Sequence, residues 1–179
     1  MLILKKLIEN YSCSYPDERA PHKMLEYLKT NDCFSNNNYH GHFTGSAWVV
    51  SPNRKKILMN HHKKLNKWLQ FGGHADGEED LLRVALREAM EESGIEDFKV
   101  FSRKIFDMDI HEIPEQTGQP SHKHYDVRFI LEADPLKSKV VTSDESYDVA
   151  WVSVERVLEL NSEISIQRMV KKTLLIQKN

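Results

Sequence analysis

Two spacings of hydrophobic residues along this chain predict its helices and its strands. In the first 40 residues, apolar side chains recur at helical spacing, at Ile3, Leu4, Leu7 and Ile8 and, beyond a break from Pro16 to Pro21, at Met24, Leu25 and Leu28. We expect two short amphipathic helices there. Such a pair can pack on the core, form a dimer contact or cover a site as a lid, and packing is the commonest case. The Asn- and Gly-rich residues 34–46 that follow predict a loop.

Runs of alternating or continuous apolar residues, bounded by turn-forming residues, predict five strands: residues 47–50, 56–60, 99–113, 122–133 and 149–152. The first two flank residues 51–53, Ser-Pro-Asn, which favours a hairpin. The third and fourth flank a loop that contains Gly118 and Pro120. After the fifth strand, Ser153 is a plausible N-cap for a helix, and helical spacing from Ser165 predicts a last helix.

Polar side chains share one face of two of these strands. In the strand at 122–133, every second residue is apolar, and the other face carries His124, Asp126 and Arg128. In the strand at 99–113, the corresponding polar face carries Asp107, Asp109 and His111. If the two strands pair, their polar faces merge into one wall. A wall that merely faces water is the other interpretation, and the sequence leaves both open.

The strongest helical pattern lies at residues 79–93, which contain no Gly or Pro. Apolar residues at Leu82, Ala85, Leu86 and Ala89 predict one buried face, and Gly94 supplies a residue that can end the helix in the left-handed conformation. Three acidic residues with the spacing i, i+3, i+4 crowd one turn of another face: Glu88, Glu91 and Glu92. Because these ligands are all oxygens, they favour a hard cation, Mg2+ or Mn2+, over zinc.

A Gly-Gly pair precedes this helix, and the whole segment has a recognisable spacing. Gly73, Glu79, Arg87, Glu88, Glu91, Glu92, Gly94 and Ile95 fit the pattern G-x5-E-x7-R-E-U-x-E-E-x-G-U, where U is apolar. Residues 73–95 therefore resemble the Nudix box, and the chain resembles a Nudix hydrolase. A solvated acidic helix is the simpler interpretation, but eight fixed positions in a loop-then-helix context make a chance match improbable.

The resemblance covers roughly residues 43–160 and implies a fold, an activity and a metal. It implies an α/β fold, an α/β/α sandwich with a mixed sheet, here with an N-terminal helical extension at residues 1–40 before a Nudix domain at 41–179. It also implies a divalent-metal-dependent pyrophosphohydrolase that uses Mg2+ or Mn2+ and cleaves a nucleoside diphosphate linked to another moiety.

The resemblance also implies roles for single residues. By position, Glu88 and Glu92 hold the metal, Glu91 shares or bridges it, and the carbonyl of Gly72 completes the shell. Arg87 gives structural and electrostatic support by pairing with Glu79. In the family an acidic residue in the loop before a strand with Trp reaches the metal site, and Glu145, six residues before Trp151, is the best match, with Asp144 next. A metal-bound carboxylate is a weak base, so Glu145 is our candidate general base, with a box glutamate as the alternative.

The substrate is less well defined by the sequence. The polar wall, with His124, Asp126, Arg128 and Asp109, offers donors and acceptors for sugar hydroxyls and a phosphate, which favours ADP-ribose or a nucleotide sugar. A nucleoside triphosphate or a dinucleoside polyphosphate is the alternative substrate, and the family also includes an isomerase of isoprenyl diphosphates. A ligand-sensing module without turnover is the alternative of another class, although such modules normally carry a degraded box.

Composition excludes several other classes. The chain has 179 residues, a formal net charge of −2 and a pI near 6.5, so it lacks the basic footprint of a protein that binds nucleic acid polymers. Cys13 and Cys33 are too few for a disulfide framework, and no long apolar run suggests a membrane segment. We therefore expect a cytoplasmic protein with a small nucleotide as its partner, and a homodimer stays open.

Overall fold

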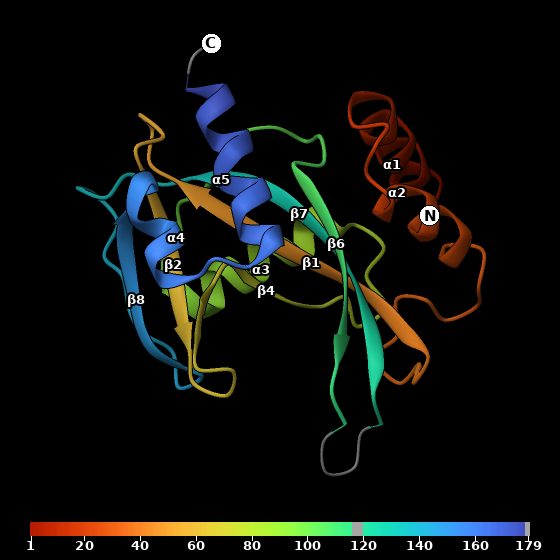
Figure 1. Ribbon diagram of the computed structural model, residues 1–179. Helices are drawn as coiled ribbons and strands as arrows, with labels where there is room; N and C mark the ends of the chain where they lie inside the picture. The colour runs from red at the N-terminus through yellow and green to blue at the C-terminus, as the bar shows by residue number, and fades with distance from the viewer. Residues whose placement is uncertain (116–119, 178–179) are drawn as a thin grey trace.

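The computed structural model describes residues 1–115 and 120–177, in which helices cover both faces of a mixed sheet (Figure 1). The strands in these residues are β1 Gly41–Val50, β2 Lys56–His62, β3 Lys67–Leu69, β4 Phe71–His74, β5 Lys99–Val100, β6 Asp107–Ile113, β7 His122–Glu132 and β8 Ser146–Ser153. The helices are α1 Leu2–Ser14, α2 Ala20–Tyr27, α3 Leu81–Ser93, α4 Val157–Leu160 and α5 Ile164–Ile176, with a 3-10 turn, η1, at Val154–Arg156. Gly118, in the predicted loop, lies outside the described residues.

Strand β1 is the centre of the sheet. On one edge it pairs in parallel with β7 along its full length. Its other edge is shared, because β4 pairs antiparallel with Thr44 to Ala47 and β2 pairs antiparallel with Val49 and Val50. Beyond these neighbours, β2 pairs with β3 and β8, and β7 pairs with β5 and β6. Strands β2, β3, β4 and β8 therefore lie on one side of β1, and β5, β6 and β7 lie on the other.

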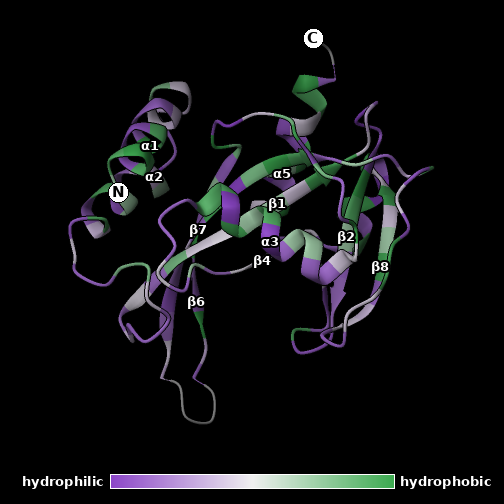
Figure 2. Ribbon diagram, turned by 180° about the vertical axis from the view of Figure 1, so that it is seen from behind, coloured by the Kyte–Doolittle hydropathy of each residue, from purple (hydrophilic) through white to green (hydrophobic). Residues whose placement is uncertain are grey.

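The side chains of β1 alternate between two hydrophobic layers. Phe43, Ala47 and Val49 pack into the layer beneath α3, whereas Trp48 and Val50 pack into the layer beneath α4 and α5. Figure 2, seen from behind, places α3 in front of the sheet and shows hydrophobic residues along its middle. This arrangement confirms the predicted α/β/α sandwich.

Strands β3 and β4 are not among the predicted strands, β8 begins before its predicted start at 149, and two other predicted strands differ more. Strand β1 begins at Gly41, so residues 41–46 of the predicted loop at 34–46 form its first half. These residues are Gly- and His-rich, but they gain ladder partners in β7 and from Thr44 onward in β4, and this pairing overrides their weak strand propensity. The predicted strand at 99–113 is two strands, β5 and β6, and both pair with β7.

Side-chain capping begins helix α3, but it does not begin the helix predicted after Ser153. Helix α3 begins after Asp80, whose carboxylate accepts hydrogen bonds from the backbone N–H groups of Leu82 and Arg83, and it ends at Gly94 with φ 68°. The predicted N-cap at Ser153 is wrong, because its side chain makes no capping hydrogen bond and the chain continues as η1 before α4.

The N-terminal helices pack on the Nudix-like core, as expected. Leu4, Ile8 and Met24 are buried in the same hydrophobic cluster as the residues beneath α3. The ring of Tyr27 stacks on Tyr125 of β7 with centroids 3.9 Å apart. Within the described residues, no helix is long and apolar enough to cross a membrane.

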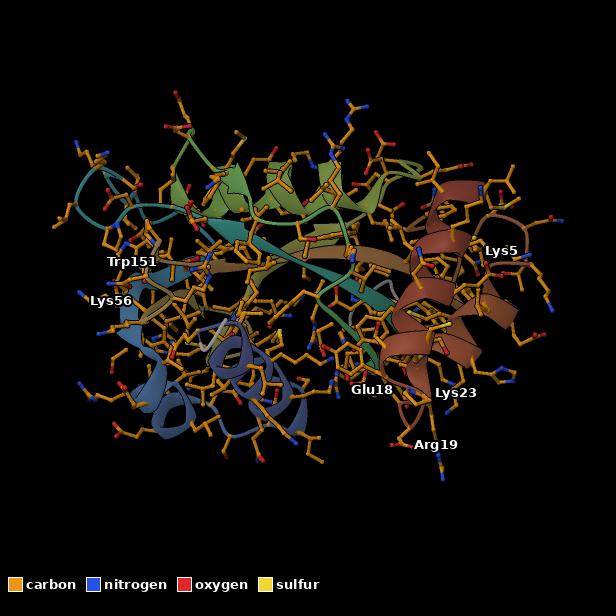
Figure 3. All side chains as sticks on the ribbon, turned by 90° about the horizontal axis from the view of Figure 1, so that it is seen from above. Lys5, Glu18, Arg19, Lys23, Lys56 and Trp151 are labelled. Carbon is orange, nitrogen blue, oxygen red and sulfur yellow. The ribbon has the colours of Figure 1, made fainter. Side chains whose placement is uncertain are left out.

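A buried ion network fastens these helices to the sheet and to α5. Its members are Glu18 between α1 and α2, Asp107 and Asp109 on β6, Asp126 and Arg128 on β7, and Arg168 and Lys172 on α5. Arg128 lies 2.6 Å from Asp126 and 3.2 Å from Asp107, and Lys172 lies 2.7 Å from Asp107 and 3.0 Å from Glu18. In Figure 3, Glu18 lies on the side of the helical pair that faces the core, whereas Arg19 and Lys23 point outward.

Replacing Arg128 with Met tests the importance of this network. The variant leaves two buried carboxylates, Asp107 and Asp126, and the partly exposed Asp109 without their shared cation, so we expect a loss of roughly 3–5 kcal/mol in the free energy of unfolding. Arg156→Met is the matched control, because Arg156 pairs with Glu159 at an exposed site, and its loss should stay within about 0.5 kcal/mol. Urea denaturation of the three proteins measures both values, and equal stabilities would contradict the proposed role.

Candidate active site

The site predicted from the acidic helix is organised around Glu92, whose side chain lies between α3 and the sheet. The backbone N–H of Gly72 on β4 donates a hydrogen bond of 2.9 Å to one carboxylate oxygen of Glu92. The side-chain amide of Asn60 on β2 donates to the other oxygen. Glu92 lies in the last turn of α3, and it is only 9% exposed although it is a carboxylate. Two strands therefore fix the position of one box glutamate.

The surroundings of Glu92 disfavour its charged form. Burial raises its pKa to about 7, and the negative charges of Glu88 and Glu145 act in the same direction, while the hydrogen bonds from Gly72 and Asn60 oppose the shift. The same contributions show that Glu88 and Glu145 lie close enough to Glu92 for their charges to act on it. Three carboxylates from two segments of the chain thus converge on one region.

Glu88 lies against the second glycine of the Gly-Gly pair. A Cβ atom at Gly73 would overlap the carboxylate of Glu88, which would have to move from its present position. The guanidinium of Arg87 donates to Glu88 at 2.6 Å and to the backbone carbonyl of His74 at 2.7 Å. Arg87 therefore connects the helix to the end of β4.

The expected pair between Arg87 and Glu79 is wrong in this structure. Glu79 is exposed and forms an ion pair with the N-terminal amine of Met1 instead. Arg87 supports the loop through the carbonyl of His74, so the connection between loop and helix is made by a backbone acceptor and not by the predicted carboxylate.

The two remaining predicted acids are exposed. Glu91 points to solvent, one residue before the buried Glu92, and its charge raises the pKa of Arg87. Glu145 lies in the loop before β8, where its backbone carbonyl accepts a hydrogen bond of 2.9 Å from the N–H of Lys63. Because its charge acts on both Glu92 and His62, the carboxylate of Glu145 lies beside the site.

The residues present fit a hard divalent cation. The donors are carboxylates, and among the described residues Glu88 alone of the four acids has a basic partner. Burial makes a free charge on Glu92 costly. Glu88, Glu91 and Glu92, with the carbonyl of Gly72, are the groups that would hold Mg2+ or Mn2+, and Glu145 lies near enough for its charge to act on Glu92.

The predicted substrate-binding wall is only partly open. As expected, β6 and β7 pair, with Asp109 opposite Asp126 and His111 opposite His124. Asp126 and Arg128 are each 2% exposed and belong to the buried ion network, because α5 covers this end of the wall. The expectation that these two residues contact substrate directly is therefore not supported.

The other two residues of the predicted wall remain partly exposed. Asp109 has its pKa lowered to about 2, because hydrogen bonds from His111 and Arg168 and the charges of Arg128 and Arg168 outweigh burial, which raises it. His124 belongs to a cluster of histidines.

Asn60, which donates to Glu92, is not among the predicted site residues. An Asn within a strand does not indicate a functional site until the strand is placed beside α3.

Sequence comparison identifies the family. Residues 42–172 match the NUDIX domain family, which is most of the chain. The chain belongs to the Nudix family. As a member of that family with an intact box, it is a pyrophosphohydrolase, and residues 73–95 are its Nudix box. No significant match was found among curated proteins.

Solved structures share the fold at low sequence identity. The dihydroneopterin triphosphate pyrophosphohydrolase of E. coli is 16% identical, with a TM-score of 0.57 over 75% of this chain and 95% of that one. A C. elegans Ap4A hydrolase is 17% identical, with a TM-score of 0.54 over 76% and 97%. A bifunctional NMN adenylyltransferase/ADP ribose pyrophosphatase from Francisella tularensis, complexed with AMP and a Mn ion, is 17% identical, with a TM-score of 0.50 over 94% and 52%.

The variant Glu92→Gln tests whether Glu92 serves a cation or the fold. Glutamine keeps an acceptor for the N–H of Gly72 and removes a charge that burial disfavours, so we expect the melting temperature in EDTA to stay the same or rise. The rise in melting temperature that Mn2+ gives to the wild type should be lost.

Glu96→Gln is the control, because Glu96 is exposed and lies outside the box turns. Thermal melts with EDTA and with Mn2+ should not distinguish this control from the wild type. A Glu92→Gln variant that melts far below the wild type in EDTA would show that Glu92 is a structural residue.

Proposed function

We propose that this protein uses a divalent cation, Mg2+ or Mn2+, to hydrolyse the pyrophosphate linkage of a nucleoside diphosphate joined to another moiety. ADP-ribose or a nucleotide sugar is the favoured substrate. The observation that carries the proposal is the position of Glu92, buried and doubly hydrogen-bonded beside two further carboxylates, in a sequence with a complete Nudix box.

The reaction requires charge neutralisation and an activated water. A bound divalent cation supplies both, because it offsets the charge of the diphosphate and lowers the pKa of water. In the proposed reaction, the oxygen of water attacks one phosphorus and the bridging P–O bond breaks. The two products then each carry a phosphate, and the proton lost from the water must be accepted by a base.

Residues of the chain take distinct roles in this proposal. Glu88 and Glu92 hold the cation, Glu91 shares it from the exposed side, and Gly72 contributes its carbonyl. Arg87 is a positioning residue, because it contacts Glu88 and the carbonyl of His74. The hydrogen bonds from Gly72 and Asn60 keep the carboxylate of Glu92 in place before substrate binds.

Glu145 is the proposed general base. It lies on a segment separate from the box, its charge reaches Glu92, and its exposed carboxylate has no ion-pair partner within the described residues. A carboxylate outside the cation's main ligands keeps more of its basicity. The loop is anchored by two hydrogen bonds with Lys63, to the carbonyls of Asp144 and Glu145, which leave the Glu145 side chain free to turn.

The polar wall on β6 and β7 does not select the substrate. Asp109, His111 and His124 have donors and acceptors suited to sugar hydroxyls, but they lie on the face of the sheet away from the glutamates of the Nudix box. Among structures with the same fold, one acts on ADP-ribose, one on Ap4A and one on dihydroneopterin triphosphate, so the fold alone does not choose between them.

A turnover screen tests the substrate class. Protein with Mg2+ or Mn2+ is incubated with ADP-ribose, nucleotide sugars, NADH, dinucleoside polyphosphates and nucleoside triphosphates, and phosphorylated products are measured. We expect the highest kcat/KM for a nucleoside diphosphate linked to a sugar. A triphosphate that leads by a wide margin would refute this preference, and binding without products from any compound would favour the ligand-sensing alternative.

The variant Glu145→Gln tests the general base. We expect kcat to fall by roughly 10²- to 10⁴-fold with a modest change in KM, because proton abstraction is lost while binding is kept. Asp144→Asn is the matched control, since Asp144 is adjacent and also exposed, and it should keep wild-type kcat. A normal kcat in Glu145→Gln, together with a collapse in Glu91→Gln, would assign the base to the box.

A further inference from the structure

Five histidines gather on one face of the sheet, away from the glutamates of the Nudix box. They are His42 on β1, His74 on β4, His111 on β6, and His122 and His124 on β7. Alternation along β4 separates them from the acidic helix. A side chain at Gly73 would meet Glu88 of α3, whereas one at Gly72 would meet Ser46, so His74 shares the face of Ser46.

Three of these rings are arranged closely enough to share one ion. The ring centroids are 4.9 Å apart for His42 and His74, 4.8 Å for His42 and His124, and 5.2 Å for His74 and His124. One nitrogen from each ring lies within 4.8 Å of one nitrogen from each of the others. These distances allow all three nitrogens to approach a single central position with small side-chain movements.

Several nitrogens of this cluster have no hydrogen-bond partner among the described residues. Both ring nitrogens of His42 are buried without a partner, as is Nε2 of His124, and His42 is fully buried. A buried polar atom without a partner costs free energy, and few remain in a folded protein without a ligand or other reason. Here several such atoms lie in one place, in rings contributed by β1 and β7.

Burial disfavours the protonated form of two of the three rings, His42 and His124. Burial, together with the neighbouring histidines, lowers the pKa of His42 to about 4 and that of His124 to about 2. Neutral imidazoles carry no charge to attract a phosphate group. They offer lone pairs, which is the form in which histidine binds transition metals.

We propose that His42, His74 and His124 bind one transition-metal ion of the zinc class. Three imidazole nitrogens without a carboxylate suit Zn2+, Ni2+ or Cu2+ and are poor ligands for Mg2+. Zn2+ also accepts three protein ligands with a fourth position for water or another group. The site is separate from the all-oxygen site of the Nudix box, and it stands whether or not the proposed hydrolysis is correct.

His122 and His111 differ from the three ligands. Nδ1 of His122 lies 2.8 Å from the carbonyl of Pro120, which favours the tautomer that leaves Nε2 unprotonated, and this Nε2 is buried without a partner. The ring of His122 therefore lies beside those of His42 and His124, with centroids 5.1 and 5.2 Å away, and has a free lone pair at Nε2. His111 is turned to Asp109, with Nδ1 3.5 Å from the carboxylate.

An ion in this position would join three strands that are distant in the sequence. It would hold together the first residues of β1, the first residues of β7 and the end of β4. His74 also presents its backbone carbonyl to Arg87, which contacts Glu88. The metal would thus steady the strand that carries the glycines of the box, without taking a place in the box itself.

Metal titration of the full-length protein tests the proposal. Protein stripped with EDTA, and then freed of EDTA, is titrated with Zn2+ in competition with a chromophoric chelator, and with Co2+ while the visible absorption is recorded. We expect one Zn2+ bound per chain, a Co2+ spectrum of low coordination number, and a higher melting temperature with Zn2+. Excess Mg2+ should not displace the ion.

Four variants locate the bound ion. His74→Gln and His124→Gln, at half-buried positions, should each weaken Zn2+ binding by roughly 100-fold or more, since even outer-shell changes cost 10- to 100-fold. His22→Gln, at an exposed position on α2, should bind Zn2+ like the wild type. Glu92→Gln tests whether the ion lies in the Nudix box instead. X-ray absorption of the wild type with Zn2+ should show imidazole ligands, which keeps the test valid if a variant fails to fold.

Several results would overturn the assignment. Absence of saturable Zn2+ binding by the wild type, or unchanged binding in both histidine variants, would remove the site. Loss of binding in Glu92→Gln with retention in the histidine variants would place the ion in the Nudix box. An absorption spectrum with only oxygen ligands would do the same.

Discussion

The burial of the Glu92 carboxylate between α3 and the sheet is the constraint around which the site is built. Raising its pKa from an ordinary 4.5 to about 7 corresponds to roughly 3 kcal/mol against the charged form. The fold offsets part of this cost with donors from Gly72 and Asn60, which requires β2 and β4 to end beside the helix. A cation at this place would offset more of it, so metal binding and the stability of α3 are linked.

On the opposite face of the sheet, buried charges are neutralised by ion pairs between side chains. Arg128, Arg168 and Lys172 are surrounded by four carboxylates, so most of the charge is compensated within the chain. This compensation uses side chains from β6, β7, α5 and the segment between α1 and α2. The N-terminal helices, which lie outside the matched Nudix residues, are therefore held by charge as well as by apolar packing. That attachment restricts them from acting as a freely moving lid.

Much of this could be predicted from the sequence, because some features depend on local spacing alone. Helix α3, its end at Gly94 and the crowding of the glutamates follow from positions within about 20 residues. The first half of β1 was missed, since its residues become a strand only through ladders with β4 and β7. The fate of Arg128 was missed for a similar reason, because only the placement of α5 decides whether a polar strand face is open or covered.

Strand β4 brings two kinds of chemistry within three residues. Successive residues of a strand point to opposite faces, so Gly73 faces the acidic helix while His74 faces the other histidines. A hard cation and a zinc-class ion prefer different donors, carboxylate oxygen in one case and imidazole nitrogen in the other, so the two sites need not compete for metal. The carbonyl of His74 accepts a hydrogen bond from Arg87, and its ring lies in the histidine cluster. Movement of this one residue would therefore change contacts on both faces. Coupling between the faces therefore has a short physical path through β4.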